Sequence, residues 1–199
     1  MNQKSRVRQM ALIGLLGGIS GIMMYIQFPL PFLPPFMSYD PSSIVEMIGG
    51  FALGPVAAIL IILVKLLIKI VLQGTSSAFT GEIQNFLISC SYVLPAVLIY
   101  RRRKNKKSAV TGMAVGTVLC AIVAVFTNVY MIIPFYVTLM GMSMESIILM
   151  CSKINPYMNS MVTVAIVGIV PFNIIKFGVN SLVTSLLYKR ISVPLKKIL

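Results

Sequence analysis

Polar side chains interrupt an otherwise apolar sequence at a few positions where they could bind a ligand. Asn173 and Lys176 stand three residues apart and so share one face of a helix. Asn128 stands in a second apolar segment, and Glu82 and Asn85 share a face at the start of a third. An asparagine amide offers two donors and one acceptor with two lone pairs, which suits the imide edge of a flat heterocycle. A carboxylate beside an amide suits a ligand rich in hydroxyl groups.

Each of these residues also has a structural interpretation. Lys176 could form an ion pair with Glu82 or Asp40, Asn128 could make a hydrogen bond between helices, and Glu82 could complement a helix dipole. Counting at 1.5 Å per residue places Lys176 roughly 18 Å above the inner end of its helix, at lipid depth. A charge there must face protein or water, so a binding role is favoured for Lys176.

Enzymatic chemistry has little support in the sequence. The chain contains no histidine, and it lacks both a GxSxG nucleophile motif and a GxxxxGK[ST] phosphate loop. Cys90, Cys120 and Cys151 are widely spaced and form no CxxC pair. We therefore expect no enzyme activity, no metal site and no cofactor, and any energy input must come from a partner or a gradient.

The composition places these residues in a membrane protein. Of the 199 residues, 58% are hydrophobic and 11% are charged, with a mean hydropathy of +0.95, whereas soluble domains carry about 25% charged residues. The net charge of +13 comes largely from basic clusters that abut apolar runs: Lys4, Arg6 and Arg8; residues 101–107; and Lys189, Arg190, Lys196 and Lys197. This arrangement is typical of cytoplasmic helix ends and argues against nucleic-acid binding.

The apolar runs predict an all-α, polytopic membrane protein with a single domain over residues 1–199. The second run decides the helix count, because only its division into two helices places all three basic clusters on one side. Gly54 and Pro55 supply the break. We therefore expect six transmembrane helices, with both termini cytoplasmic, at about 9–27, 43–54, 55–72, 83–100, 109–138 and 160–188.

Two further segments suggest moving or docking parts. Residues 28–42 are too rich in proline for a helix and too apolar for an ordinary loop, which predicts an outer lid that includes Leu33, Pro34 and Phe36. Anchoring at the membrane interface is the less specific alternative. Gly14 and Gly18 have a small-xxx-small spacing that could dock another helix, although packing within the chain is equally possible.

Five motifs together resemble a known family. They are FPLPFLPPFMSYD (28–40), GGFALGP (49–55), GEIQNF (81–86), NVYMIIPFY (128–136) and PFNIIK (171–176). The chain is similar to the substrate-binding subunits of energy-coupling factor vitamin transporters, and within them to the riboflavin-specific members. The resemblance implies a six-helix fold in a bacterial plasma membrane, with a vitamin pocket near the outer face beneath the loop after the first helix.

The resemblance also implies roles for particular residues. Asn128, Asn173 and Lys176 would hold the flavin ring, and Glu82, Asn85 and Asp40 would contact the ribityl chain or frame the pocket. Residues matching Gly14 and Gly18, commonly alanine in the family, would dock onto a membrane coupling subunit driven by two ATPases.

The function implied by the resemblance is high-affinity riboflavin binding for ATP-driven uptake, with riboflavin as transported ligand. The alternatives are the same transporter class with FMN or another vitamin as ligand, and a purely structural membrane subunit.

Overall fold

The computed structural model describes residues 3–30, 33, 37–75 and 77–198. Its elements, in chain order, are α1 (Gln3–Tyr25), β1 (Phe28–Pro29), β2 (Ser38–Tyr39), α2 (Ser42–Leu53), α3 (Pro55–Gln73), α4 (Thr80–Arg102), α5 (Lys106–Thr127), the π-helical turn η1 (Asn128–Ile132), α6 (Ile133–Thr138), α7 (Met144–Ile154), α8 (Met161–Thr163), the π-helical turn η2 (Val164–Ile169) and α9 (Val170–Ile198). The predicted all-α class is confirmed, since the short β1–β2 ladder is the exception among the described elements.

Among the described residues, five helical stretches are long and apolar enough to cross a membrane. They are Gln3–Tyr25, Pro55–Gln73, Thr80–Arg102, Lys106–Thr138 and Met161–Tyr188. The last two are continuous across their π-helical turns, so that α5, η1 and α6 form one rod and α8, η2 and α9 form another. Helix α2 is apolar but has only 12 residues, fewer than the ~20 that a full span requires.

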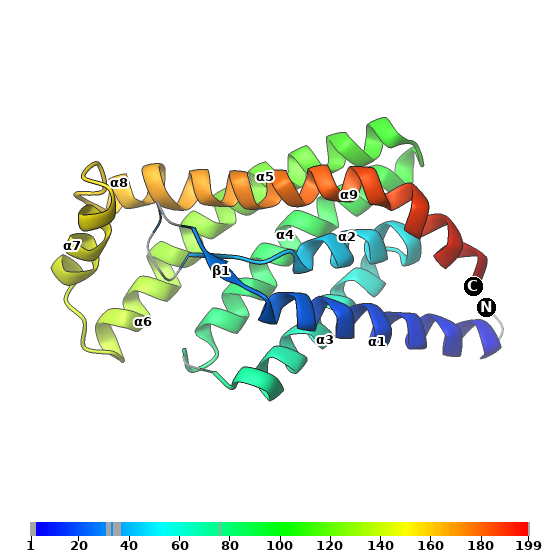
Figure 1. The fold of residues 1–199 in the computed structure, drawn as a ribbon, viewed down its shortest axis with the longest axis horizontal. Helices are drawn as coiled ribbons and strands as arrows, with labels where there is room; N and C mark the ends of the chain where they lie inside the picture. Colours follow the sequence, from blue (N-terminus) through cyan, green and yellow to red (C-terminus); the bar gives the residue numbers. More distant parts are fainter. Residues whose placement is uncertain (1–2, 31–32, 34–36, 76, 199) are drawn as a thin grey trace.

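Helix α2 lies inside the bundle. Every residue from 42 to 51 is buried, and α2 packs against α1, α3, α4 and α9. It ends because Gly54 adopts a φ of 104°, a conformation that side chains disfavour, and Pro55 then begins α3. Figure 1 shows α2 and α1 running side by side below α9.

Basic helix ends gather at one end of the molecule. Figure 1 shows the start of α1, the end of α9 and the turn between α4 and α5 at one end. That turn carries Arg101 and Arg102 at the end of α4 and is followed by Lys106 and Lys107 at the start of α5. Helix α7, which the sequence did not predict within residues 139–159, lies at the opposite end.

Each π-helical turn lies just before a proline. Pro134 follows Tyr130 of η1 by four residues, and Pro171 follows Val167 of η2 by four residues. A proline has no N–H group, and its ring clashes with the carbonyl four residues earlier, so the regular α-helical hydrogen bond cannot form there. The wider π-helical turns accommodate the carbonyls of Tyr130 and Val167. Such turns are frequent at functional sites.

Candidate ligand-binding site

Three cavities meet at Asn128. A pocket of about 110 Å³ is lined by the sequence-predicted Asn85, Asn128, Asn173 and Lys176. A polar cavity of about 440 Å³ also contacts Asn85 and Asn128 and includes Glu82. An apolar cavity of about 330 Å³ contacts Asn128 from the side of α7. The structure therefore brings five of the six predicted ligand-binding residues to one connected region.

The two asparagines of the central pocket are held in the same way. Asn128 Nδ2 donates to the Ala124 carbonyl at 2.7 Å, and Asn173 Nδ2 donates to the Ile169 carbonyl at 2.8 Å. Both bonds run back along the residue's own helix, and among the described residues no donor reaches either Oδ1 atom. Each amide therefore keeps an acceptor and a second N–H group for a ligand.

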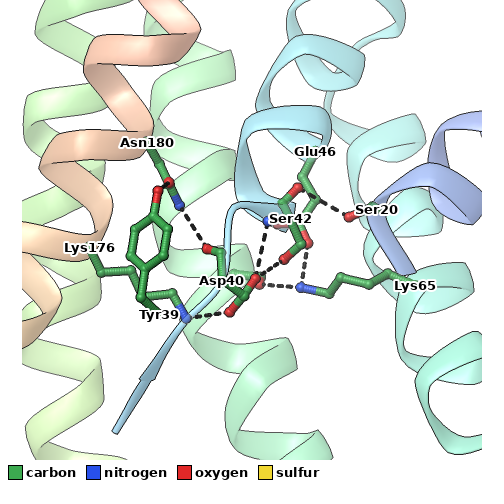
Figure 2. Close-up of polar contacts among 9 residues, drawn as sticks. Ser20, Tyr39, Asp40, Ser42, Glu46, Lys65, Lys176 and Asn180 are labelled. Atoms are coloured by element: carbon green, nitrogen blue, oxygen red, sulfur yellow. Dashed lines mark hydrogen bonds and ion pairs between the residues drawn. The ribbon is translucent and has the colours of Figure 1, made fainter. Parts of the chain in front are cut away.

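Lys176 forms an ion pair with the sixth predicted residue, Asp40. Its Nζ atom lies 2.6 Å from Asp40 Oδ2, and both side chains are buried. Figure 2 shows Lys176 reaching from α9 toward the short segment between β2 and α2. Of the structural alternatives for Lys176, the structure forms the pair with Asp40, whereas Glu82 has a different partner. Asp40 thus joins the site through the ammonium group of Lys176.

The Lys176–Asp40 pair and a neighbouring hydrogen bond hold the end of the 28–42 segment against α9. Tyr39 Oη donates to Asn180 Oδ1 at 2.7 Å, and Asp40 Oδ1 accepts hydrogen bonds from the backbone N–H and hydroxyl of Ser42. Asn180 lies four residues after Lys176, on the same face of α9. Neither Tyr39 nor Asn180 is among the site residues predicted from the sequence, although the spacing of Asn180 from Lys176 is a usable signal.

The charges around Asp40 shift its titration. Burial alone raises the pKa of the Asp40 carboxyl, but the positive charges of Lys176 and Lys65, with the hydrogen bonds from Lys176 and Ser42, lower it to about 2. Burial and then the Asp40 charge raise the pKa of the Tyr39 hydroxyl. At neutral pH Asp40 is therefore ionised and Tyr39 remains a hydrogen-bond donor.

A second ion pair lies behind the first. Lys65 of α3 contacts Glu46 of α2, and both side chains are fully buried. Lys65 Nζ also donates to Ser89 Oγ of α4 at 3.0 Å. Figure 2 shows Lys65 and Glu46 beside Asp40 and Ser42. The sequence does not predict this pair, because nothing in the spacing of Lys65 and Glu46, which lie on two different helices, indicates the contact.

The polar cavity has an ion pair of its own. Glu82, at the start of α4, contacts Lys69 of α3 and accepts hydrogen bonds from the hydroxyls of Thr75 and Ser77 at 3.1 and 3.2 Å. Glu82 is thus held by specific partners from the preceding connection, which is more than a helix-dipole interaction. Its neighbour Asn85 lines both the polar cavity and the central pocket.

The described part of the proposed lid packs against the segment before α8, η2 and the start of α9. Leu33 and Met37 are buried in an apolar cluster with Met158, Ile169 and Phe172. Met37 also lines the central pocket. The predicted lid residues Pro34 and Phe36 lie outside the described residues.

The glycines of α1 divide into two faces. A Cβ atom on Gly17 would lie 2.5 Å from a methyl carbon of Val64, and one on Gly21 would lie 2.8 Å from a methyl carbon of Ile68, so these glycines permit close packing on α3. A Cβ on Gly14 or Gly18 would meet no atom within 4 Å. The two predicted docking glycines therefore lie on a face of α1 that the rest of the described chain leaves open.

Comparison with known proteins identifies the family. The family model described as "ECF transporter, substrate-specific component" matches residues 8–188. The chain belongs to this family. Its members are transporter components rather than enzymes, and the chain is accordingly a membrane transport subunit.

Individual relatives of this substrate-specific component carry more specific names. It is 32% identical over 191 residues to "Riboflavin transporter RibU" of Staphylococcus aureus (strain TCH60), covering 96% of this chain and 94% of that protein. It is 26% identical over 184 residues to "Riboflavin transporter FmnP" of Bacillus subtilis (strain 168), covering 92% and 91%. A solved structure described as "Structure and mechanism of the S component of a bacterial ECF transporter" matches with a TM-score of 0.74 and 31% identity, covering 96% of this chain and 99% of that one.

Proposed function

We propose that this chain is the riboflavin-binding subunit of an energy-coupling factor transporter and mediates riboflavin uptake. The observation that carries the proposal is the convergence of Asn128, Asn173 and Lys176 on one pocket. Asn128 comes from η1, whereas Asn173 and Lys176 lie three residues apart on α9, and the two asparagines each keep a free amide oxygen. A relative that is 32% identical over nearly the whole chain is named a riboflavin transporter.

The proposed pose follows from the polarity of the three cavities. The acceptor oxygens of Asn128 and Asn173 suit the imide N–H of a flavin, and the Lys176 ammonium suits its carbonyl oxygens. The polar cavity beside Glu82 and Asn85 suits the ribityl hydroxyls, and the apolar cavity suits the methylated end of the ring. Because ligand pockets typically measure about 300–1,000 Å³, the flavin would extend from the central pocket into its neighbours, beneath a lid formed by residues 28–42.

We further propose six membrane crossings within a single domain, with both termini cytoplasmic. The five long helices and the short α2, which packs inside the bundle, would supply the crossings. In this orientation the basic ends of α4 and α5 lie in the cytoplasm, as the positive-inside rule requires. The proposed site, α7 and residues 28–42 would then face the outside of a bacterial plasma membrane.

The proposed partners are a membrane coupling subunit and two ATPase subunits. The chain carries no phosphate-loop motif, so ATP hydrolysis would be supplied by those partners. The open face of α1 at Gly14 and Gly18 would receive a helix of the coupling subunit, because small residues allow helix axes to approach closely in a membrane.

Riboflavin titration of the detergent-purified protein tests the proposal. Binding should quench flavin fluorescence. Asn173→Ala or Lys176→Met should raise the Kd for riboflavin by about tenfold or more, since each removes a charge-assisted or buried hydrogen bond to the ligand. Asn159→Ala, at an exposed position before α8, is the matched control and should bind as the unmodified protein does. Absence of flavin binding by the unmodified protein would reject riboflavin as the ligand and direct the search to other vitamins.

A further inference from the structure

The polar cavity contains a charge arrangement that the proposed function leaves unexplained. Its lining includes Gln27, Gln73, Gln84 and Asn85, which offer neutral donors and acceptors. Among its described lining residues, the ionisable side chains are Lys69, Glu82 and Tyr136. Lys69 and Glu82 contact each other, so the cavity is polar but carries no net charge at neutral pH.

Lys69 and Glu82 contact each other directly, and their side chains are only partly exposed to solvent. The side chain of Lys69 is 19% exposed and that of Glu82 is 6% exposed. Thr75 and Ser77 donate hydrogen bonds to Glu82 Oε2, while Lys69 contacts Oε1. Both carboxylate oxygens are thus occupied, and the positive charge of Lys69 is neutralised by its neighbour.

We propose that the Lys69–Glu82 pair makes the site select flavins with an uncharged ribityl end over their phosphate esters. This inference rests on the proposed function, because it assumes that the ribityl chain enters the polar cavity. A terminal hydroxyl of riboflavin can use the neutral groups of the cavity, whereas FMN carries about −1.5 to −2 charges at the same position at pH 7.

The energetic argument concerns what a phosphate would meet there. The phosphate would be repelled by Glu82, and it could recruit Lys69 only if Lys69 left Glu82. Glu82 is nearly buried, and removing its cation would leave a desolvated carboxylate with hydroxyl partners alone, which is costly. The pair therefore disfavours phosphate binding in two ways. Glu82 repels the phosphate, and Lys69, the one cation among the described lining residues, is already paired with Glu82.

Competition between riboflavin and FMN tests this selection. The quantity measured is the ratio of the Kd for FMN to the Kd for riboflavin, obtained by fluorescence titration of the purified full-length protein. Glu82→Gln keeps the size of the side chain and one acceptor oxygen for Thr75 and Ser77 but frees Lys69, and it should lower the ratio by about tenfold or more. Lys69→Met removes the cation and leaves Glu82, and it should raise the ratio.

The controls separate this inference from the proposed function. Glu145→Gln, an exposed carboxylate on α7 outside the cavity, should leave the ratio unchanged. If the unmodified protein binds riboflavin and Glu82→Gln binds both flavins with an unchanged ratio, the selection mechanism is wrong while the function stands. If the unmodified protein binds no flavin, the function itself is wrong.

A pH titration of the unmodified protein gives an answer that needs no variant. The second phosphate proton of FMN binds with a pKa of about 6, so the ratio should fall between about pH 7.5 and about pH 5 as the ligand loses negative charge. Increasing salt should reduce the ratio as well, because the charges near the cavity mouth are partly exposed to solvent. A ratio that is insensitive to both pH and salt would overturn the proposal even if Glu82→Gln did not fold.

Discussion

At the scale of individual residues, two buried ion pairs lie side by side. Glu46 with Lys65 and Asp40 with Lys176 link four segments of the chain, namely α2, α3, α9 and the end of residues 28–42. The Lys65 charge also acts on Asp40. Because each acid lies beside a base, the cluster carries no net charge, and this neutrality permits four ionisable side chains to stay buried at this depth.

Removal of one partner from the inner pair should be strongly destabilising. Lys65→Met would leave Glu46 as a fully buried carboxylate without its cation, at a cost of roughly 3–5 kcal/mol in the free energy of unfolding. Thermal or denaturant unfolding in detergent measures this loss. Lys153→Met, at an exposed position on α7, is the matched control and should change stability by less than about 0.5 kcal/mol.

The double variant Glu46→Leu with Lys65→Met provides the decisive comparison. It removes both charges, so it should recover most of the stability that the single variant loses. Equal destabilisation by the single and the double variant would mean that packing, and not charge pairing, explains the effect.

Asp40 should make part of the stability depend on acidity. Its folded-state pKa of about 2 lies below its ordinary value of 3.8, so its contribution is fully present above pH 3.8 and is lost as pH falls through about 2. The difference corresponds to roughly 2 kcal/mol. The stability gap between the unmodified protein and Asp40→Asn, measured by unfolding in detergent, should therefore stay constant above about pH 5 and narrow as the pH falls from about 4 toward about 2. Other carboxylates titrate in both proteins, and a constant gap would show that the ionised form of Asp40 is not preferentially stabilised.

The sequence predicts neighbours on the same helix better than contacts between helices. Asn173 and Lys176 were paired by their spacing, and both line the central pocket. The partners Tyr39 and Asn180 are 141 positions apart, and such a contact depends on how β2 is laid onto α9. Two alternatives could be stated for Lys176 from the sequence, but only the three-dimensional arrangement selects Asp40.

At the scale of elements, α1 presents different chemistry on its two glycine faces. Gly17 and Gly21 are used inside the bundle against α3, whereas Gly14 and Gly18 have open space around them. Gly17 and Gly21 have the same small-xxx-small spacing as Gly14 and Gly18, so the spacing alone cannot tell which pair faces inward.

Leucine substitutions on the two faces should therefore have different effects. Gly14→Leu with Gly18→Leu should leave riboflavin binding by the isolated chain unchanged and reduce assembly with the coupling subunit, which co-purification measures. Gly17→Leu with Gly21→Leu should lower the thermal unfolding temperature, because the added atoms would overlap Val64 and Ile68. Normal assembly by the Gly14 and Gly18 variant would show that the coupling subunit docks elsewhere.

The π-helical turns and α7 show what apolar periodicity cannot predict. The sequence predicted continuous helices over 109–138 and 160–188, and the structure contains rods that include η1 and η2 within these ranges. A single extra residue in a turn changes which face the following side chains occupy, but it leaves the overall hydropathy unchanged. Helix α7 has only 11 residues and lies in a mixed polar segment, below the length that an apolar-run search detects.

At the scale of the whole molecule, the basic clusters and the three cavities lie toward opposite ends of the bundle. The basic turn between α4 and α5 lies at one end, together with the start of α1 and the end of α9. The cavities lie toward the other end, next to α6 and α7. This polarity requires one orientation in the membrane if the basic end is cytoplasmic, and a ligand would then enter from the outside.

Site-specific labelling in intact cells can test this orientation. In a background with Cys90, Cys120 and Cys151 replaced by alanine, Tyr157→Cys would report on the end that carries α7, where Tyr157 is 76% exposed. Lys104→Cys would report on the exposed turn between α4 and α5. A membrane-impermeant maleimide should label position 157 in intact cells and position 104 only after permeabilisation. Labelling of position 104 in intact cells would show that the orientation is the opposite of the proposed one, and that the site would then face the cytoplasm.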